Sequence, residues 1–376
     1  MFKHYKYNQL NYISEGSYGN VWVVNDKTTD TPVAMKVIGN CLRSVNDSRV
    51  ILKEIYILMA LQYTHINIIN IYDIFIYNKD ICIIFELMDT NLYQMIQYPP
   101  RNYNETYVKY ILNEILNAIN FMHTNHIMHR DIKPQNILIK NNQIKICDFG
   151  LSKLIEDEKD VRQPLTDHVV TRWYRAPEVI LKYKNYSYPI DIWSIGCIFA
   201  ELLLILPNSS SDNTKSVLFP GKSDFSLSPT ASRTIQSDDQ LIKIIEVIGE
   251  ISQSDLDEMD ISSEIQAKLK TIKINKTADI DSIFDTYDIS CDCINLLKKM
   301  LIINPKNRIT ADQALSDSYF IDIVHDGTKS EYSKPNESFL QKTKQVENKT
   351  INNIKNIINN LQENAFSEPP LKKMRT

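Results

Sequence analysis

The sequence predicts an α+β fold in two parts: a small antiparallel sheet with one helix, and a larger, mainly helical part. Two β-branched runs, at residues 21–25 and 31–39, flank a turn cluster of Asp, Lys and Thr, and two more follow at 68–76 and 81–88. Between these pairs, residues 48–61 carry apolar side chains at helical spacing. After Thr90 long amphipathic helices are predicted, most clearly at 107–125 and 190–206.

Composition and charge exclude several classes of protein. The 376 residues carry a formal net charge of −4, which gives no basic field for a nucleic-acid backbone. No apolar run reaches the roughly 18 residues that span a bilayer, and the opening MFKHYKYNQL lacks the apolar stretch of a signal peptide. The only close cysteine pair, Cys291 and Cys293, lacks the spacing of zinc or redox motifs. We expect an intracellular monomer, cytoplasmic with the nucleus as an alternative, that binds neither nucleic acid nor membrane.

Two segments depart from this pattern. Residues 207–239 are rich in Ser, Asn, Asp and Pro, which predicts a surface insertion that is partly mobile. The part after Ser333 is rich in Asn and Lys, yet Ile351, Ile354, Ile358 and Leu361 share one helical face. We expect a tail helix that docks on the rest of the protein. The final PPLKKMRT is typical of a solvated terminus, with a docking or nuclear-entry signal as the alternative.

The stretch ISEGSYGNV at residues 13–21 lies between two strand-like runs. Glycines at such a place let backbone N–H groups approach phosphates without a Cβ in the way. Ser14 stands where the pattern G-x-G-x-x-G has its first glycine, and taken alone the segment also fits a plain hairpin turn. The candidate nucleotide-binding residues here are Ile13, Ser14, Glu15, Gly16, Ser17, Tyr18, Gly19, Asn20 and Val21.

A lysine and a glutamate form the next candidate pair. Lys36 ends the motif VAMK on the strand after the glycine-containing hairpin, where it would hold nucleotide phosphates. A buried ammonium group needs a fixed carboxylate, and Glu54 lies in the middle of the following helix. Each residue alone is typical of a solvated surface position. Both together, in this order, predict an ion pair.

Two further motifs, HRDIKPQN at 129–136 and KICDFG at 145–150, carry the strongest signal for catalysis. Asp131 can accept the proton of an attacking hydroxyl, and Lys133 can neutralise a moving phosphoryl group. Asn136 and Asp148 supply the hard oxygen ligands that magnesium prefers. Strand-like residues between the motifs form a hairpin that would bring the two ligands together. The spacing therefore predicts phosphoryl transfer.

With APE at 176–178 and DIWSIG at 191–196, the chain resembles eukaryotic protein kinases from Tyr12 to about Tyr319. Lys133 after HRDI is similar to the serine/threonine branch, and TRWYRAPE (171–178) to mitogen-activated and cyclin-dependent kinases. The stretches ELMDTNLYQMI (86–96), KICDFG and LFPGK (218–222) resemble mitogen-activated protein kinases. The resemblance implies a two-lobed kinase fold, with an N-lobe at 1–88, a C-lobe at 89–332 and a tail at 333–376. It also implies ATP and Mg²⁺ as cofactors and Ser/Thr side chains of proteins, followed by proline, as substrates.

The resemblance assigns the adenine site. Phe85 would be the gatekeeper, Glu86 and Met88 would offer backbone hydrogen bonds to adenine, and Ala34 and Leu138 would enclose the purine ring.

It also assigns supports in the helical part. Asp191 would tie down the catalytic loop, and Glu178 would pair with Arg308. The remaining expected roles are for Thr171, which would hydrogen-bond Asp131 and Lys133, and for Val170 and Arg175, which would shape a pocket for the proline.

The activation segment departs from the family pattern. Where the family has Thr-x-Tyr, this chain has Thr166, Asp167 and His168, as in an atypical protist branch that it resembles. We expect activation by a single phosphorylation, at Thr166, by an upstream kinase or by autophosphorylation. The resemblance places Arg130, Lys153 and Lys53 in the pocket for that phosphate, where the two lysines cannot form bidentate contacts.

Two other interpretations stay open at this point. A non-catalytic kinase-like scaffold would normally have lost Asp131, Asp148 or Lys36, and all three are present. A cyclin-dependent kinase would need a cyclin-binding signature around Glu54, to which SRVILKEIYIL has little likeness.

The acidic docking patch of the family is eroded at residues 320–331, where His325 and Lys329 accompany Asp326.

Overall fold

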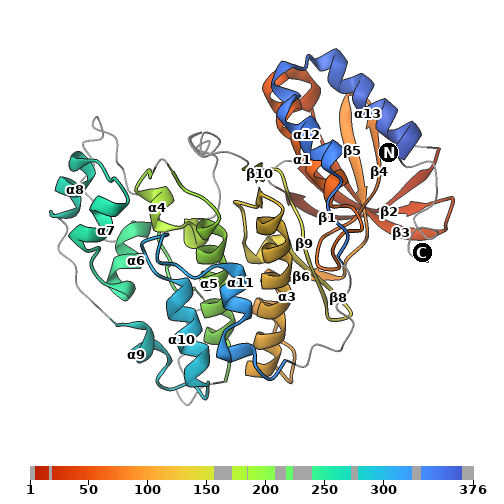
Figure 1. Cartoon of the computed structure of the whole chain (residues 1–376). Coiled ribbons are helices and arrows are strands. Elements are labelled where there is room, and N and C mark those ends of the chain that lie inside the picture. The colour runs from red at the N-terminus through yellow and green to blue at the C-terminus, as the bar shows by residue number, and fades with distance from the viewer. Residues whose placement is uncertain are drawn as a thin grey trace. The chain divides into compact units, whose positions relative to one another are not determined.

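The computed structural model describes residues 5–16, 19–155, 172–183, 185–207, 217–222, 239–271, 278–323 and 332–365. The chain divides into two compact units. The first unit comprises residues 1–90, 138–152 and 330–376, and the second comprises residues 91–137 and 153–329. Figure 1 labels the helices and strands of both units.

A five-stranded antiparallel sheet in the order β1-β2-β3-β5-β4 forms the centre of the first unit. One core cluster of this unit contains side chains from all five strands, including Tyr7, Val24, Met35, Phe75 and Ile84. The β-branched runs of the sequence become these strands because their alternating side chains can be buried in this way. The bounds are β1 (Tyr7–Gly16), β2 (Gly19–Asp26), β3 (Thr31–Ile38), β4 (Ile71–Tyr77) and β5 (Asp80–Phe85).

One long helix, α1 (Val45–Leu61), follows β3 after a single 3₁₀ turn, η1 (Cys41–Arg43). Ser44 caps it by accepting a hydrogen bond from the Asp47 N–H at 3.3 Å. The helix buries most of its length, and Glu54 is only 2% exposed although it is ionisable. A buried carboxylate in the middle of a helix requires a partner.

Residues 138–152 also belong to the first unit. Strand β9 (Gln143–Ile146) pairs with β8 (Ile137–Lys140), and β6 (Thr90–Asn91) completes a small sheet in the order β6-β8-β9. The Ile146 N–H donates to the Asn67 carbonyl at 2.8 Å, and the Ile146 carbonyl accepts from the Ile69 N–H at 3.0 Å. These bonds fix the segment that leads directly to Asp148.

The tail forms helix α12 (Glu337–Lys344), a 3₁₀ turn η6 (Val346–Asn348) and helix α13 (Ile351–Ala365). Figure 1 shows α12 beside α1 and α13 beside β4, and both pairs are in contact. Ile354 and Ile358 are fully buried, whereas Ile351 and Leu361 are partly exposed. Residues 351–365 thus form a helix in contact with β4 of the first unit.

The second unit is mainly helical. Helix α3 (Glu105–Thr124), capped by Asn104, packs against α5 (Pro189–Leu204) and α11 (Ala311–Leu315). Nearly every residue of α5 is buried, which explains its strongly apolar sequence. The other helices are α2 (Leu92–Gln97), α4 (Pro177–Ile180), α6 (Gln240–Ile248), α7 (Gln253–Glu258), α8 (Ser263–Leu269), α9 (Ile280–Phe284) and α10 (Cys291–Met300).

Short elements complete this unit. Strand β7 (Ile127–Met128) pairs with β10 (Lys153–Leu154), and the 3₁₀ turns are η2 (Pro134–Asn136), η4 (Arg172–Tyr174) and η5 (Ser318–Phe320). Cys291 and Cys293 begin α10, as ordinary residues of a helix start.

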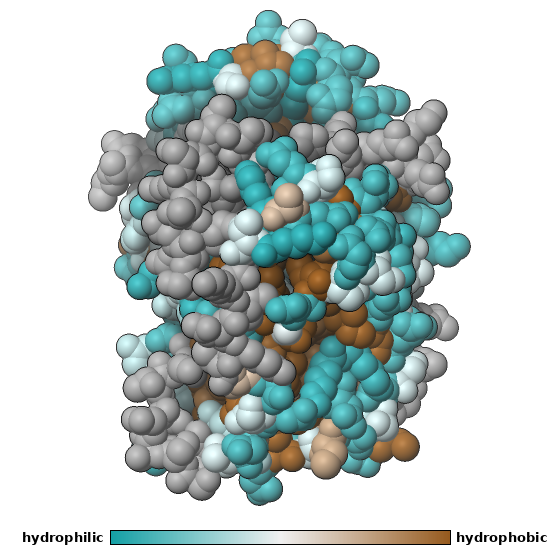
Figure 2. Space-filling view, turned by 90° about the vertical axis from the view of Figure 1, so that its left-hand side faces the viewer, coloured by the Kyte–Doolittle hydropathy of each residue, from teal (hydrophilic) through white to brown (hydrophobic). Residues whose placement is uncertain are grey.

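The surface drawn in Figure 2 is largely hydrophilic on the described residues, with apolar side chains visible in the lower half. Among the helices that the structure describes, none has the length and hydrophobicity needed to cross a membrane.

Candidate active site

Lys36 lies between two carboxylates in the first unit. Its Nζ is 2.8 Å from Glu54 Oε1 and 3.1 Å from Asp148 Oδ1. Strand β3 supplies the lysine, helix α1 the glutamate, and the segment after β9 the aspartate. The ion pair between Lys36 and Glu54 that the sequence predicts is therefore present, and Asp148 joins it.

The two carboxylates control the charge of Lys36. Burial alone would lower the pKa of its ammonium group, but Glu54 and Asp148 together raise that pKa above the ordinary value of a lysine. Lys36 is therefore positively charged at any physiological pH, whereas burial raises the pKa of the Glu54 carboxyl against the attraction of Lys36. Asp148 has a left-handed backbone, with φ 65°, and its side chain is 19% exposed. It is the most accessible of the three.

The candidate phosphate-binding hairpin is formed by β1 and β2, which pair as far as Gly16 and Gly19. A Cβ on Gly19 would lie 2.1 Å from the carbonyl oxygen of Val37, so only glycine fits this position. Ser14 is exposed on β1 opposite Val21, directly after an irregularity in the β1–β2 pairing between Tyr12 and Ser14. Ser17 and Tyr18 lie outside the described residues.

The candidate adenine site lies at the end of β5, where Phe85 pairs in register with Ala34 of β3. The Glu86 N–H donates to the Asn70 carbonyl at 3.3 Å, so its carbonyl is the group that can accept a hydrogen bond from adenine. The Glu86 carboxylate is committed elsewhere, since Oε1 accepts from the Asn70 N–H at 2.8 Å and lies 3.1 Å from Lys145 Nζ. Met88 and Leu138 are both half-buried.

Asp131 is the centre of a buried polar cluster in the second unit. Its Oδ2 accepts hydrogen bonds from Lys133 Nζ at 2.8 Å and from Asn136 Nδ2 at 3.0 Å. Asn136 Nδ2 also donates to the Asp131 carbonyl at 2.8 Å. Because both partners of this amide nitrogen are acceptors, the Asn136 amide oxygen must face the other way. The three candidates from HRDIKPQN therefore lie together, with one asparagine oxygen directed away from the aspartate.

Asp191 of α5 holds the backbone of His129 and Arg130, at the start of the candidate catalytic segment HRDIKPQN. Its Oδ2 accepts from the His129 N–H at 2.9 Å and its Oδ1 from the Arg130 N–H at 2.8 Å, and His123 Nε2 lies 2.9 Å from Oδ2. Burial would raise the pKa of Asp191, but the hydrogen bond from His123 and the bonds from the loop lower it. The anchoring that the resemblance implies for Asp191 is confirmed. His123, which supports it, has no signal in the sequence beyond its place in a helix.

Glu178 and Arg308 form a fully buried, bidentate pair in the same unit. Arg308 Nη1 donates to Glu178 Oε1 at 2.7 Å and Nη2 to Oε2 at 2.8 Å, and the guanidinium lies 5.0 Å from the centre of the Trp193 ring. The expected pairing is therefore confirmed. It fixes α4, which follows the segment expected to shape the substrate pocket.

The three residues expected in the pocket for the Thr166 phosphate lie on different segments of the chain. Lys53 of α1 pairs with Glu347 of the tail, a contact that sequence reasoning missed. Lys153 lies on β10, paired in register with Met128, and Arg130 has a left-handed backbone with φ 71°. The remaining expected residues, which are Thr166, Asp167, His168, Val170, Thr171, His325, Asp326 and Lys329, lie outside the described residues, as do 208–216 and 223–238 of the insertion.

Sequence reasoning also missed Glu201, a buried residue of α5 whose carboxyl group contacts Tyr174. Tyr174 donates its hydroxyl to Glu201 Oε2 at 2.7 Å, and the Trp173 indole N–H donates to the Gly221 carbonyl at 3.0 Å. Burial raises the pKa of Glu201 to about 7, although the hydrogen bond from Tyr174 opposes it. Nothing in the local sequence distinguishes this glutamate, because its partner lies on a different element.

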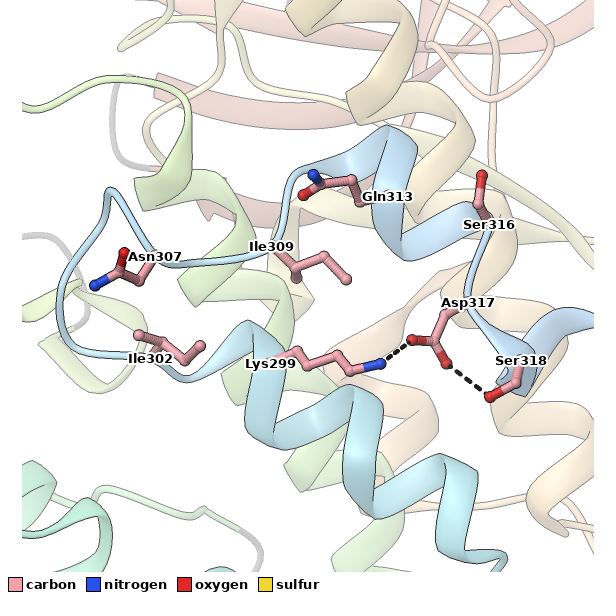
Figure 3. A pocket seen from close by; sticks show the side chains of 8 residues that line it. All are labelled: Lys299, Ile302, Asn307, Ile309, Gln313, Ser316, Asp317 and Ser318. Atoms are coloured by element: carbon pink, nitrogen blue, oxygen red, sulfur yellow. Dashed lines mark hydrogen bonds and ion pairs between the residues drawn. The ribbon is translucent and has the colours of Figure 1, made fainter.

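An open pocket of about 510 Å³ lies in the second unit, between the end of α10 and α11 (Figure 3). An ion pair between Lys299 and Asp317 at 2.7 Å crosses one end of it, and none of the candidate catalytic residues lines it. The lining residues are Lys299, Ile302, Asn307, Ile309, Gln313, Ser316, Asp317 and Ser318.

Comparison with known proteins identifies the family. Residues 7–320 match the protein kinase domain. The chain is 33% identical over 320 residues to extracellular signal-regulated kinase 2 of Dictyostelium discoideum, covering 84% of this chain and 79% of that protein. Mitogen-activated protein kinase 3 of Oryza sativa subsp. japonica is 34% identical over 321 residues (84% and 78%), and mitogen-activated protein kinase mpk-1 of Caenorhabditis elegans 36% over 320 residues (84% and 65%). The chain therefore belongs to the protein kinase family, and it is a protein serine/threonine kinase of the mitogen-activated type.

Proposed function

We propose that this kinase transfers the γ-phosphoryl group of ATP to Ser or Thr side chains followed by proline, and that phosphorylation of Thr166 switches it on. Asp131 accepts the proton of the attacking hydroxyl, and Lys133 neutralises the phosphoryl group as it moves. Lys36, kept charged by Glu54, holds the α- and β-phosphates. The single observation that supports this best is the buried cluster in which Lys133 and Asn136 both fix Asp131 Oδ2.

The donor set fits magnesium. The Asn136 amide oxygen faces away from Asp131, and Asp148 offers the most exposed carboxylate of its cluster. An amide oxygen and a carboxylate are hard ligands of the kind that Mg²⁺ takes together with phosphate oxygens. When bound, the ion would neutralise charge on the β- and γ-phosphates. Asn136 and Asp148 would hold it.

The catalytic assignment is tested with radiolabelled ATP and a generic basic protein substrate. Asp131→Asn keeps the shape of the side chain but removes the proton acceptor, so we expect kcat to fall at least about 100-fold. Asp285→Asn, at an exposed position of the second unit, is the matched control and should retain full activity. Equal activity of the two variants would refute the role of Asp131.

The preference for proline is tested separately with a peptide library. Proline lacks an N–H donor, so a pocket that offers no acceptor favours it over other residues at that position. Peptides with Ser-Pro should be phosphorylated at least about tenfold faster than matched Ser-Ala peptides. Equal rates for the two peptides would show that the kinase does not prefer proline, and would not affect the assignment of phosphoryl transfer itself.

The switch at Thr166 is tested by mass spectrometry of active and inactive preparations. A phosphothreonine there would gain charge-assisted hydrogen bonds from Arg130 and Lys153, and also from Lys53, which would then serve both the phosphate and Glu347. The proposal requires activity to rise with the phosphorylated fraction of Thr166 and Thr166→Val to abolish that rise. A kinase-dead Asp131→Asn chain distinguishes an upstream kinase from autophosphorylation, because it can be modified only by another enzyme. Full activation with unmodified Thr166 would refute the switch.

A further inference from the structure

The tail follows helix α1 closely within the first unit (Figure 1). The Asn336 N–H donates to the Ala60 carbonyl at 2.9 Å, and the ring of Phe339 lies 6.2 Å from that of Tyr56. Ala60 and Tyr56 are four residues apart in α1, which is about one helical turn. The tail therefore runs along α1 from the C-terminal end of the helix toward its N-terminal end.

Farther along, Glu347 meets two cations of α1. Its Oε1 pairs with Lys53 Nζ, and its Oε2 lies 3.9 Å from Arg49 Nη1. Arg49 Nε also donates to the Lys349 carbonyl at 3.2 Å. Arg49 and Lys53 are one turn apart on the same face of α1, where two like charges repel each other unless an anion lies between them. The hydrogen bond from Lys53 lowers the pKa of Glu347, so this carboxylate is ionised at neutral pH.

The face held by the tail is adjacent to the face that carries Glu54. Consecutive residues of a helix point about 100° apart, so Lys53 and Glu54 leave α1 in different directions. Glu54 points inward to Lys36, whereas the Lys53 side chain is 36% exposed and points to Glu347. Any rotation of α1 that withdraws Glu54 from Lys36 would also pull Lys53 and Arg49 away from Glu347.

We propose that Glu347 is a positioning residue of this kinase: its carboxylate fixes the rotation of α1 and so holds Glu54 at Lys36. The inference rests on the proposed role of the Lys36–Glu54 pair in phosphoryl transfer. Glu347 gives the cations of α1 an anion from within the chain, so the pair with Lys36 forms before Thr166 is phosphorylated. Phosphorylation then adds to an arrangement that the tail already maintains.

The test compares basal kcat and KM for ATP of full-length, phosphatase-treated proteins at a temperature well below their unfolding. Glu347→Lys places a third cation beside Arg49 and Lys53, and should lower kcat/KM about five- to twentyfold. The swapped double variant Lys53→Glu/Glu347→Lys should recover to within about threefold of wild type. Asp281→Lys is the matched control, because Asp281 pairs with Lys298 with similar exposure of both side chains, and it should leave kcat/KM unchanged.

Hydrogen exchange supplies a readout of α1 itself. Glu347→Lys should speed amide exchange in residues 45–61 several-fold, whereas Asp281→Lys should not change it. The inference is overturned if Glu347→Lys and Asp281→Lys behave alike, or if the swapped variant stays as impaired as Glu347→Lys. Glu54→Gln distinguishes a failure of the proposed Lys36–Glu54 role from a failure of the proposed Glu347 role. If Glu54→Gln leaves kcat/KM intact, the proposed role of the Lys36–Glu54 pair fails; if only Glu54→Gln lowers it, the role of Glu347 fails.

Discussion

Gly19 shows how one position in the nucleotide-binding hairpin excludes every side chain. Its Cα faces the backbone of the neighbouring strand β3, and a Cβ would lie 2.1 Å from the Val37 carbonyl oxygen. Real Cβ atoms do not approach that closely, so a larger residue must push β2 away from β3. Ser14, by contrast, is an exposed strand residue, so the solvent leaves room for its side chain.

We therefore predict that Gly19→Ala raises the KM for ATP at least about tenfold, because the strands that carry the hairpin must separate. Steady-state kinetics with varied ATP measure this. Gly39→Ala is the control in the same unit, since its Cβ would meet only Asp80 Oδ1 at an ordinary 3.8 Å. A KM for ATP that is unchanged in Gly19→Ala would contradict the predicted location of the phosphates.

Glu201 makes folding stability depend on pH. Burial raises the pKa of its carboxyl to about 7, so between about pH 4.5 and 7 the folded state binds this proton more tightly than the unfolded chain. Stability from this group is therefore fully present at low pH and is lost as pH rises through 7. The difference from an ordinary glutamate corresponds to about 3 kcal/mol at most.

Glu201→Gln should remove this dependence, since an amide can still accept the hydrogen bond of Tyr174 but does not ionise. As the pH rises from 5 to 8, the free energy of unfolding of the wild type should fall relative to that of Glu201→Gln, by up to about 3 kcal/mol. Urea unfolding across that pH range measures it. The same substitution at Glu264, an exposed residue of α8, should leave the pH profile unchanged, and a parallel profile for both variants would count against the burial argument.

At the scale of elements, α4 depends on a contact across 130 residues of sequence. Both oxygens of Glu178 are used by the fork of Arg308, which also donates to the Pro189 carbonyl at 2.8 Å and so connects α4 to the start of α5. A lysine carries the same charge but presents a single nitrogen. Helix α4 is thus held by a geometry that only arginine supplies.

Arg308→Lys should lower the free energy of unfolding by about 3–5 kcal/mol, because it leaves buried acceptors unpaired and loses the stacking on Trp193. Chemical denaturation measures this loss. Arg101→Lys, at an exposed position in the same unit, should change stability by less than about 0.5 kcal/mol. If both variants unfold at the same denaturant concentration, the bidentate pair contributes far less than its burial indicates.

Periodicity and motif order made much of this predictable. The β-branched runs became β2 to β5, the apolar face of the tail became α13 with Ile354 and Ile358 buried, and Glu54 was found at Lys36. The contacts that sequence could not supply join surface residues far apart in the chain. Lys53 and Glu347 are separated by 294 residues, and no pattern in the sequence pairs one with the other. Such pairs depend on how elements pack, which no local signal encodes.

At the scale of the whole molecule, the two units alternate along the chain. The sequence predicts a small sheet followed by a helical part, and the expected kinase fold with a sheet-based N-lobe and a helical C-lobe is confirmed. Residues 138–152 and the tail nevertheless join the first unit, because their partners there are hydrogen-bonded strands and the face of α1. As a result Asp148 belongs with Lys36, and Asn136 with Asp131.

Binding of Mg²⁺-ATP should raise the free energy of unfolding, because the ligand binds the folded chain and not the unfolded one. A ligand at 100 times its Kd adds about 2.7 kcal/mol of stability, which raises the unfolding temperature by several degrees. ATP with a chelator should give a clearly smaller rise, because the carboxylate of Asp148 then faces the phosphates without the metal between them. Asp148→Asn and Asn136→Ala should each lose the magnesium-dependent part, whereas Asp285→Asn, exposed at the end of α9, should keep it. Loss in only one of the two variants would mean that the other residue is not a magnesium ligand.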